Sequence, residues 1–468
     1  MANGLQVKNL DPKKIKHARA DAKYYEMTQR PVEGLIMKLS APAVISNLVT
    51  MAYNLVDTFF IGRLGTAQSG AIGIAFSIMT ILQAVGFFFG NGSGNTLARE
   101  LGKHNEDRAA KLLSIGFFGS VGCGFLITVL GLVTLRPLVS MLGSTETIAP
   151  YAIEYLTPLL CAAPFVCASF TMNGLLRYQG QSAYAMVGLV SGAMLNLVLA
   201  PALIFGLHLG IFGAGLATAI CQTVSFGILL YMSRKFSVVA LSYRQFRPNV
   251  LLVREILGGG LPSLVRQSAG SIAVTCVNLA ANPFGDAAIA GMAIVMRIML
   301  FTNSVIVGLG QGFQPVCGYN YGAGLFPRVK RGYWFCIRMS TSLLVVFAVV
   351  LFISAPHLIG VFRSDPAVIA IGAFALRIQC FTCALNGFNM MSNMMQQTIG
   401  MTGIASFLAL CRLGLFLAPV VLILPHIFGV LGVQMAQSVS DVLSFLVTIP
   451  FQRLILRRLQ SNSAVRIH

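Results

Sequence analysis

Charged side chains are scarce in this sequence, and acidic ones are the scarcest. Only 10% of the 468 residues are charged, with 14 acids against 33 Lys and Arg, whereas an ordinary soluble domain carries roughly a quarter charged residues. Hydrophobic residues make up 56% of the chain, and the mean hydropathy is +0.78. So apolar a composition excludes an ordinary water-soluble domain.

Sequence motifs for nucleotide and metal chemistry are also missing. The nearest approach to a phosphate-binding GxxxxGK[ST] loop ends in Gly102-Lys103 but has Leu97 where the first glycine belongs. The six histidines have no metal-ligand spacing, and Cys380 and Cys383 form a single CxxC pair within an apolar segment. We therefore expect no ATP-driven pump, no enzyme, no metal site and no cofactor.

Long apolar runs fill the rest of the chain. Each is about 20 residues or longer, enough to cross a hydrocarbon core of about 30 Å. They predict an all-α polytopic membrane protein with twelve transmembrane helices in two pseudo-symmetric six-helix bundles. The expected spans are 36–60, 69–98, 111–136, 146–176, 183–207, 211–232, 256–281, 287–318, 331–356, 366–396, 402–424 and 428–456.

The longest polar connection divides the chain into two halves. We expect a cytoplasmic N-terminal tail over 1–35, since this segment is charged and lacks the apolar core of a signal peptide. The predicted N-terminal bundle covers 36–232, a cytoplasmic linker 233–255, the C-terminal bundle 256–456 and a cytoplasmic C-terminal tail 457–468.

The two halves repeat each other at a constant spacing of 220 positions. Residues that recur at this spacing are Pro42 and Pro262, Gly65 and Gly285, Gly90 and Gly310, Gly92 and Gly312, Gly102 and Gly322, Arg108 and Arg328, Ser144 and Ser364, Asn173 and Asn393, and Gly180 and Gly400. Six spans per half is an even number, so both halves enter the membrane from the same side. Repeats of this kind are typical of transporters, whose substrate sites lie between the repeats near the membrane midplane.

Basic residues cluster in every second loop. The net charge of +19 is therefore interpreted as a topology signal rather than a nucleic-acid surface, with both termini and the basic loops in the cytoplasm. We expect a multi-pass monomer in a bacterial inner membrane, with the lipid bilayer and a small-molecule substrate as partners and no nucleic acid.

Asp57 is an acid within an apolar span. On a helix it shares one face with Asn47 and Asn54, and Tyr53 flanks that face. Because an ionisable residue at such depth is costly in lipid, it is a candidate functional group. The alternative is a structural carboxylate paired with a buried arginine. The repeat places Val277 at the equivalent position, so the acid belongs to one half only.

Several motifs together resemble those of the multidrug and toxic compound extrusion (MATE) family. They are "KLSAPAVISNLVTMAYNLVDTFFIGRLG", "NGLLRYQG" at 173–180, "NLVLAP" at 196–201 and "GQGFQPVCGYNYGAG" at 310–324. The resemblance implies a twelve-helix exporter that exchanges organic compounds for incoming H⁺ or Na⁺. It also implies that Asp57, Asn196 and Thr218 form the cation-coupling site and that Asn173 faces the substrate cavity.

One residue departs from the family pattern, because Ala200 stands where many members have Asp before Pro201. The loss of one carboxylate favours H⁺ over Na⁺ as the coupling ion, with Na⁺ as the alternative.

The second half carries four arginines within its spans against one deep acid, Asp441. These arginines are Arg266, Arg297, Arg377 and Arg412. They either pair structurally, or one or two of them line the cleft and favour an anionic or zwitterionic substrate. They also support the alternative function, a flippase or exporter of a lipid-linked or anionic compound. A membrane-embedded enzyme or receptor is a third hypothesis. The residues that we expect in the substrate cavity are Asn54, Tyr53, Asn173, Asn393, Gln311 and Arg297.

Overall fold

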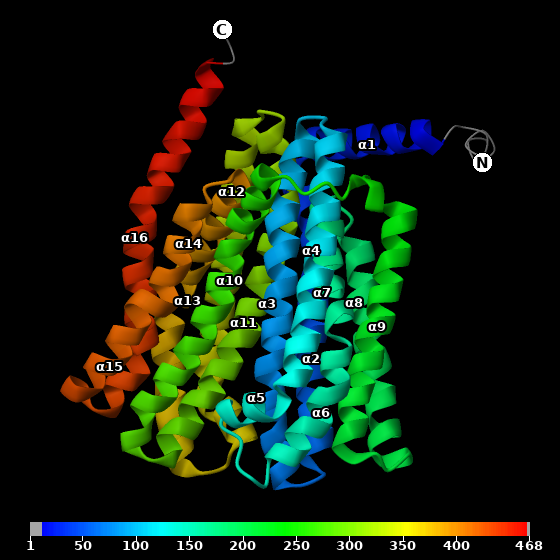
Figure 1. Cartoon of the computed structure of the whole chain (residues 1–468). Helices are drawn as coiled ribbons and strands as arrows, with labels where there is room; N and C mark the ends of the chain where they lie inside the picture. The colour runs from blue at the N-terminus through cyan, green and yellow to red at the C-terminus, as the bar shows by residue number, and fades with distance from the viewer. Residues whose placement is uncertain (1–11, 466–468) are drawn as a thin grey trace, which may run out of the picture. The chain divides into compact units, whose positions relative to one another are not determined.

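The computed structural model describes residues 12–465, and this part of the chain consists of helices and connections without a strand (Figure 1). The helices of the first half are α1 (Pro12–Gln29), α2 (Val32–Gly62), α3 (Thr66–Gly102), α4 (Glu106–Val133), α5 (Leu135–Met141), α6 (Ala149–Cys161), α7 (Ala163–Tyr178), α8 (Ser182–Pro201), η2 (Ala202–Gly206) and α9 (Gly210–Phe236). Those that follow are η3 (Tyr243–Gln245), α10 (Val250–Ala281), η4 (Asn282–Phe284), α11 (Asp286–Gly322), α12 (Phe326–Phe362), α13 (Pro366–Ile399), α14 (Thr402–Leu410), η5 (Cys411–Phe416), α15 (Leu417–Phe428) and α16 (Val430–Val465).

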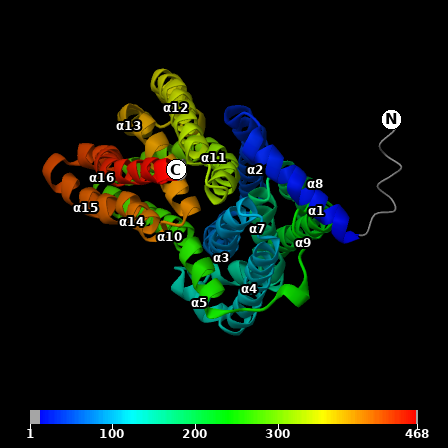
Figure 2. The same cartoon turned by 90° about the horizontal axis from the view of Figure 1, so that it is seen from above.

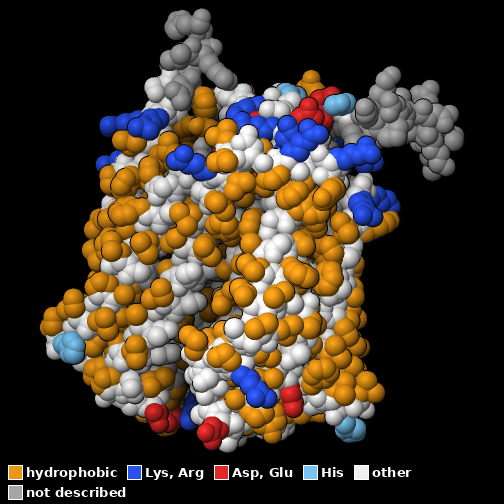
Figure 3. All heavy atoms as spheres, in the orientation of Figure 1, with side chains coloured by type: hydrophobic (Ala, Val, Ile, Leu, Met, Phe, Trp, Pro, Cys, Tyr) orange, Lys and Arg blue, Asp and Glu red, His pale blue; other side chains and the backbone are white. Residues whose placement is uncertain are grey.

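The predicted fold class is confirmed. Ten helices of the described chain are long and apolar enough to cross a membrane. In this count α8 and η2 are one helix, and α14, η5 and α15 are another. The pair α6 and α7, bent by 57°, makes an eleventh span. The twelfth expected span is α10, whose 32 residues correspond to about 48 Å at a rise of 1.5 Å per residue, although it also carries Arg254, Glu255 and Arg266. On the face drawn in Figure 3, hydrophobic side chains cover much of the middle, while the visible Lys and Arg side chains gather toward its two ends.

Two compact units make up the chain. The first comprises Met1–Gly260 with Gly318–Ala323, and the second comprises Leu261–Cys317 with Gly324–His468. In the first unit α8 packs along α9 and also against α2 (Figure 2). α6 also packs against α9. These four helices are the ones that carry the polar side chains described below.

Two helices of the first unit are interrupted, and proline explains where. Pro164 lies in the first turn of α7, where its missing N–H is tolerated, and α6 and α7 bend at Ala162. Pro201 ends α8 and is followed by the π-helical turn η2. Such turns are frequent where a helix must present a side chain out of the regular register.

The sequence repeat extends to the hydrogen bonds. In the first unit, Asn173 Nδ2 donates to the carbonyl oxygen of Ala185 at 3.0 Å. In the second unit, Asn393 Nδ2 donates to the carbonyl oxygen of Ala405 at 2.6 Å. Both partners are shifted by the same 220 positions, so the two halves use one asparagine contact to fix the connection between their fourth and fifth spans.

Helical structure extends into both predicted tails. Within the expected N-terminal tail, α1 forms over Pro12–Gln29, and its Met27 side chain is fully buried. Asn320 Nδ2 donates to the carbonyl oxygen of Met27 at 3.0 Å, which fixes the end of α1 to the first unit. At the other end of the chain, α16 continues to Val465, beyond the boundary expected at 456.

Candidate functional site

Asp57 lies among polar side chains from three other helices of the first unit. The residue is 7% exposed, and the Tyr155 hydroxyl of α6 donates to Asp57 Oδ2 at 3.4 Å. The same hydroxyl is 3.4 Å from Thr218 Oγ1 on α9. Tyr155 therefore links the acid of α2 to the threonine that the resemblance assigned to the coupling site.

The other carboxylate oxygen of Asp57 is buried without a hydrogen-bond partner among the described residues. Arg177, a buried arginine of the first unit, has other partners: its guanidinium donates to Asn91 Oδ1 at 3.1 Å and lies over the ring of Tyr178. Within residues 12–465 Asp57 has no ion pair. The alternative of a structural carboxylate–arginine pair is therefore not what the structure shows.

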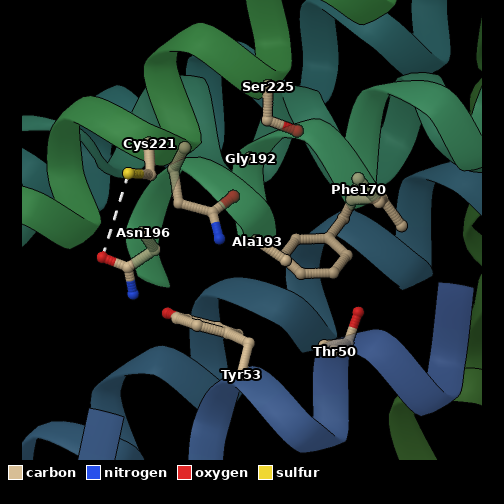
Figure 4. A pocket seen from close by; sticks show the side chains of 10 residues that line it. Thr50, Tyr53, Phe170, Gly192, Ala193, Asn196, Cys221 and Ser225 are labelled. Carbon is tan, nitrogen blue, oxygen red and sulfur yellow. Dashed lines mark hydrogen bonds between the residues drawn. The ribbon is translucent and has the colours of Figure 1, made fainter. Parts of the chain in front are cut away.

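Asn196 of α8 is 2% exposed and lies beside a thiol of α9, with Cys221 Sγ 3.8 Å from Asn196 Oδ1. Figure 4 shows the Tyr53 hydroxyl of α2 directed toward Asn196. Thr50 lies on the same side of the cavity as Tyr53 (Figure 4). The predicted coupling residue Asn196 is thus placed where α2, α8 and α9 meet.

These side chains line a narrow cavity of about 20 Å³ inside the first unit. Its lining is Thr50, Tyr53, Phe170, Leu189, Gly192, Ala193, Asn196, Cys221, Gln222 and Ser225. A cavity of this size holds about one water molecule, whereas sites for drug-sized ligands are on the order of 300–1,000 Å³. The cavity can therefore hold a water or a small ion beside the coupling residues, but in this conformation it cannot hold an organic substrate.

Six residues were predicted for the substrate cavity. Within the part of the chain that the structure describes, Tyr53 is the one of the six that lines the 20 Å³ cavity. Asn173 and Asn393 are buried and hold the helix connections described above. Asn54 is half-buried and Arg297 is exposed, whereas Gln311 is 8% exposed. Asn54 and Asn173 belong to the first unit but do not line this cavity, and Arg297, Gln311 and Asn393 belong to the second unit. The substrate role of these five residues stays a prediction.

Sequence reasoning missed two groups at this site. Tyr155 is 98 positions from Asp57, and nothing in its own segment distinguishes it from an ordinary aromatic residue of a membrane span. Cys221 could have been found, because it lies one helical turn after Thr218 and so faces the same way. Ala200, where family members often have Asp, is 1% exposed and belongs to the apolar core, so it supplies no oxygen.

In the second unit, Asp441 and Arg412 form an ion pair in which the carboxylate is buried and the arginine is partly buried. Arg412 Nε is 3.0 Å from Asp441 Oδ1, and Asn386 Nδ2 and Gln437 Nε2 also donate to this carboxylate, both at 3.2 Å. Arg412 lies on the π-helical turn η5. This pair agrees with the structural interpretation of the deep arginines.

The other three arginines have different surroundings. Arg266 donates to Asn393 Oδ1 at 3.4 Å. Arg377 donates to the carbonyl oxygen of Phe352 at 3.3 Å and lies over its ring. Arg297 is exposed on α11. Arg266 and Arg377 thus donate hydrogen bonds to neutral groups. Of the four arginines in the described chain, Asp441 forms its ion pair with Arg412.

Comparisons with known proteins agree with this architecture. The sequence pattern of the MatE family matches the chain twice, over residues 42–202 and 262–423, once in each repeat. The chain is 28% identical over 426 residues to the multidrug export protein MepA of Staphylococcus haemolyticus, covering 90% of this chain and 93% of that protein. It is also similar to the outward-facing structure of a multidrug resistance MATE family transporter of the MOP superfamily, with TM-score 0.88, 25% identity and coverage of 93% and 98%. A crystal structure of MATE in complex with MaL6 gives the same TM-score and identity, with coverage of 93% and 99%.

Proposed function

The chain belongs to the MatE family of multidrug exporters, and from this we propose that it exports organic compounds by secondary antiport, exchanging them for protons through Asp57. Membership of this family makes it a multi-pass membrane transporter of small molecules and not an enzyme. Beyond family membership, we propose the coupling ion, the residues of the coupling site and the conformational cycle.

The observation that carries the proposal is the unpartnered Asp57 Oδ1. A buried charged oxygen without a partner is unfavourable by several kcal/mol, so the carboxylate needs either a proton or a cation on this oxygen. Tyr155 can donate its hydrogen bond to the other oxygen, Oδ2, whether Oδ1 carries a proton or a cation. A group that alternates between two occupancies is what an antiporter requires of its coupling site.

In the proposed cycle, a proton that enters from outside neutralises Asp57 and favours the packing of α2 against α6 and α9 in which substrate is released. Loss of the proton to the cytoplasm restores the charge and favours the conformation that loads substrate. The proton and the substrate need only bind the two conformations with different affinity. Thr218 contacts the Tyr155 hydroxyl and Asn196 lines the small cavity, so both supply side-chain oxygens near the proposed coupling site.

A proton fits this site better than Na⁺ does. A bare Na⁺ must replace its hydration shell with several fixed oxygens, and a carboxylate at position 200 would be one source of them. Ala200 lies in the apolar core instead, and Asn196 Oδ1 already accepts a contact from Cys221. We therefore propose H⁺ as the coupling ion, with Na⁺ as the competing assignment.

The test is substrate efflux from proteoliposomes that contain Asp57→Asn. This change keeps the size of the side chain and removes its ability to titrate, so efflux driven by a pH gradient should fall to the level of empty liposomes while the protein stays folded. Asp107→Asn, which alters an exposed carboxylate, is the matched control and should transport as the wild type does. Unchanged efflux in Asp57→Asn would refute the coupling role, and wild-type efflux driven by Na⁺ at constant pH would refute the choice of ion.

The alternative function, export or flipping of an anionic or lipid-linked compound, depended on free arginines in the second half. Arg412 is paired with Asp441, which leaves this hypothesis less support than multidrug export has. An assay of lipid flipping in the same vesicles separates the two functions, because only the alternative predicts transport of a lipid-linked anion.

We also propose that the protein is a monomer of the bacterial inner membrane with both termini in the cytoplasm, as the distribution of basic residues favours. Arg247 and Glu146 are exposed and lie in connections that should face opposite sides. In a Cys161→Ser background, a membrane-impermeant thiol reagent applied to intact cells should label Glu146→Cys and spare Arg247→Cys. The reverse pattern would overturn the orientation.

A further inference from the structure

Three arginines near the end of α16 border an open hollow of about 700 Å³ in the second unit. Arg453, Arg457 and Arg458 are all exposed. Their side chains have no hydrogen-bond or ion-pair partner within residues 12–465. No Asp or Glu follows Asp441 in the sequence, so α16 itself carries no acidic side chain beside these arginines.

The helix is long enough to carry these arginines out of the hydrocarbon layer. The 36 residues of α16 correspond to about 54 Å at a rise of 1.5 Å per residue, whereas the hydrocarbon core of a bilayer is about 30 Å thick. The last turns of the helix must therefore lie at the level of the lipid headgroups or beyond. Figure 3 shows Lys and Arg side chains gathered over this end of α16.

Side chains on this face change in character along the helix axis. Pro450, Leu454, Arg457 and Ser461 follow one another at helical spacing, so they share one face. The apolar pair comes first, the cationic residue next and the hydroxyl last. By their helical positions, Arg453 and Arg458 lie on either side of this stripe.

The opposite face of the same turns is fixed to the protein. Gln452 is 1% exposed, and its Oε1 accepts a hydrogen bond from Gln396 Nε2 of α13 at 3.0 Å. Ile455 is fully buried and Leu459 is 4% exposed. Because packing against the unit holds this part of α16, the arginines are presented from a defined surface and not from a frayed helix end.

From this arrangement we infer that the hollow along the end of α16 binds one anionic phospholipid, whose phosphate lies among Arg453, Arg457 and Arg458 and whose acyl chain follows Leu454 and Pro450. A phospholipid presents acyl chain, phosphate and polar headgroup in the same order in which α16 presents apolar, cationic and hydroxyl side chains. Guanidinium groups bind phosphate oxygens in paired hydrogen bonds. Basic pockets at this level of membrane proteins are suited to anionic headgroups.

Basic residues at helix ends also orient a membrane protein without binding any one lipid. An experiment can distinguish this general role from a specific lipid site. In a general orienting role, any basic cluster of equal charge contributes equally to anionic-lipid binding. In a lipid site, the three arginines of α16 contribute and others do not. Arg244, Arg247 and Arg254 are a suitable control, because they are exposed in or near the connection between α9 and α10.

The experiment is native mass spectrometry of the purified full chain in a neutral detergent, titrated with dioleoylphosphatidylglycerol, dioleoylphosphatidylcholine or inorganic phosphate. Each basic residue of the lipid site should contribute about fivefold to anionic-lipid affinity. The triple variant R453Q/R457Q/R458Q should therefore bind phosphatidylglycerol on the order of 100-fold more weakly. The triple variant R244Q/R247Q/R254Q should bind it as the wild type does.

Single variants keep the inference testable if the triple variant does not fold, since R453Q, R457Q and R458Q should each weaken binding by about fivefold. Leu454→Asn should weaken phosphatidylglycerol binding although every cation remains. Equal affinity of the wild type for the two lipids would overturn the inference, as would equal losses in the two triple variants. Displacement of the lipid by inorganic phosphate would overturn it as well, since it would indicate a site for soluble anions.

Discussion

Gly102 and Gly322 occupy equivalent positions in the two repeats, and the backbones of their helices meet there. A Cβ atom added to Gly322 would lie 3.1 Å from Gly102 Cα and would overlap the carbonyl oxygen of Arg99, while one added to Gly102 would overlap the carbonyl oxygen of Tyr319. The end of α3 and the segment 318–322 of α11, both in the first unit, therefore pack with no side chain between them. Because each glycine opposes the other repeat's carbonyl, this contact obeys the internal symmetry of the chain.

This contact predicts that alanine is not tolerated at either glycine. Gly102→Ala and Gly322→Ala must push two helix backbones apart, which should destabilise the protein by about 1–3 kcal/mol and lower the temperature of thermal unfolding in detergent. Gly122→Ala is the control, since an added Cβ there would have no atom within 4 Å and should stabilise its helix slightly. Equal unfolding temperatures in all three variants would contradict the prediction.

Restoring a second carboxylate should change the ion preference. Ala200→Asp introduces an acid at the position where family members often have one, and efflux from liposomes should become sensitive to a Na⁺ gradient at constant pH. Ala200→Asn, which adds a similar volume without the charge, is the control and should remain insensitive to Na⁺. If neither variant responds to Na⁺ although both fold, the position does not reach the coupling site.

The ion pair of Arg412 and Asp441 should stabilise the second unit only when both charges are present. Asp441→Ala leaves a guanidinium without its countercharge and should destabilise the second unit by about 3–5 kcal/mol. The double variant Arg412→Met/Asp441→Leu removes both charges and should be markedly more stable than the single one. Thermal unfolding of the wild type, Arg412→Met, Asp441→Leu and the double variant gives the coupling energy, and additive losses would show that the two residues do not interact.

Glu26 gives the end of α1 a pH dependence. Burial by itself would raise the pKa of this carboxyl, but hydrogen bonds from Lys23 and Lys38, both at 2.7 Å, and the charges of these lysines lower it to about 2. A folded-state pKa below the usual value means that the stabilisation is complete above about pH 4.5 and is lost as the pH falls toward 2. Glu26→Gln should therefore lower the unfolding temperature at pH 7, and the difference from wild type should shrink progressively below pH 4.5.

The control for this prediction is Glu146→Gln, because Glu146 is exposed and has no ion pair in the described part of the chain. Its unfolding temperature should equal that of the wild type at every pH. A pH-independent difference between wild type and Glu26→Gln would mean that the glutamate acts through packing and not through its charge.

Much of this protein could be predicted from its sequence. The scarcity of charge required a membrane as solvent, since so apolar a chain cannot cover itself with polar surface. The recurrence of residues at 220 positions indicated two similar halves, and both the family match in each half and the paired contacts of Asn173 and Asn393 agree with it. Asp57 could be identified as a candidate because an acid is conspicuous in an apolar span, although its role in coupling remains a prediction.

Tertiary structure decided what surrounds that acid. Whether Asp57 meets an arginine, a tyrosine or nothing depends on how α2 is rotated against α6 and α9, and hydrophobic periodicity is weak in helices that are apolar on most sides. Tyr155, 98 positions away, and the open side of Asp57 Oδ1 therefore came from packing alone. The arginines at the end of α16 can likewise be read from the sequence, but the hollow beside them depends on packing and could not be predicted.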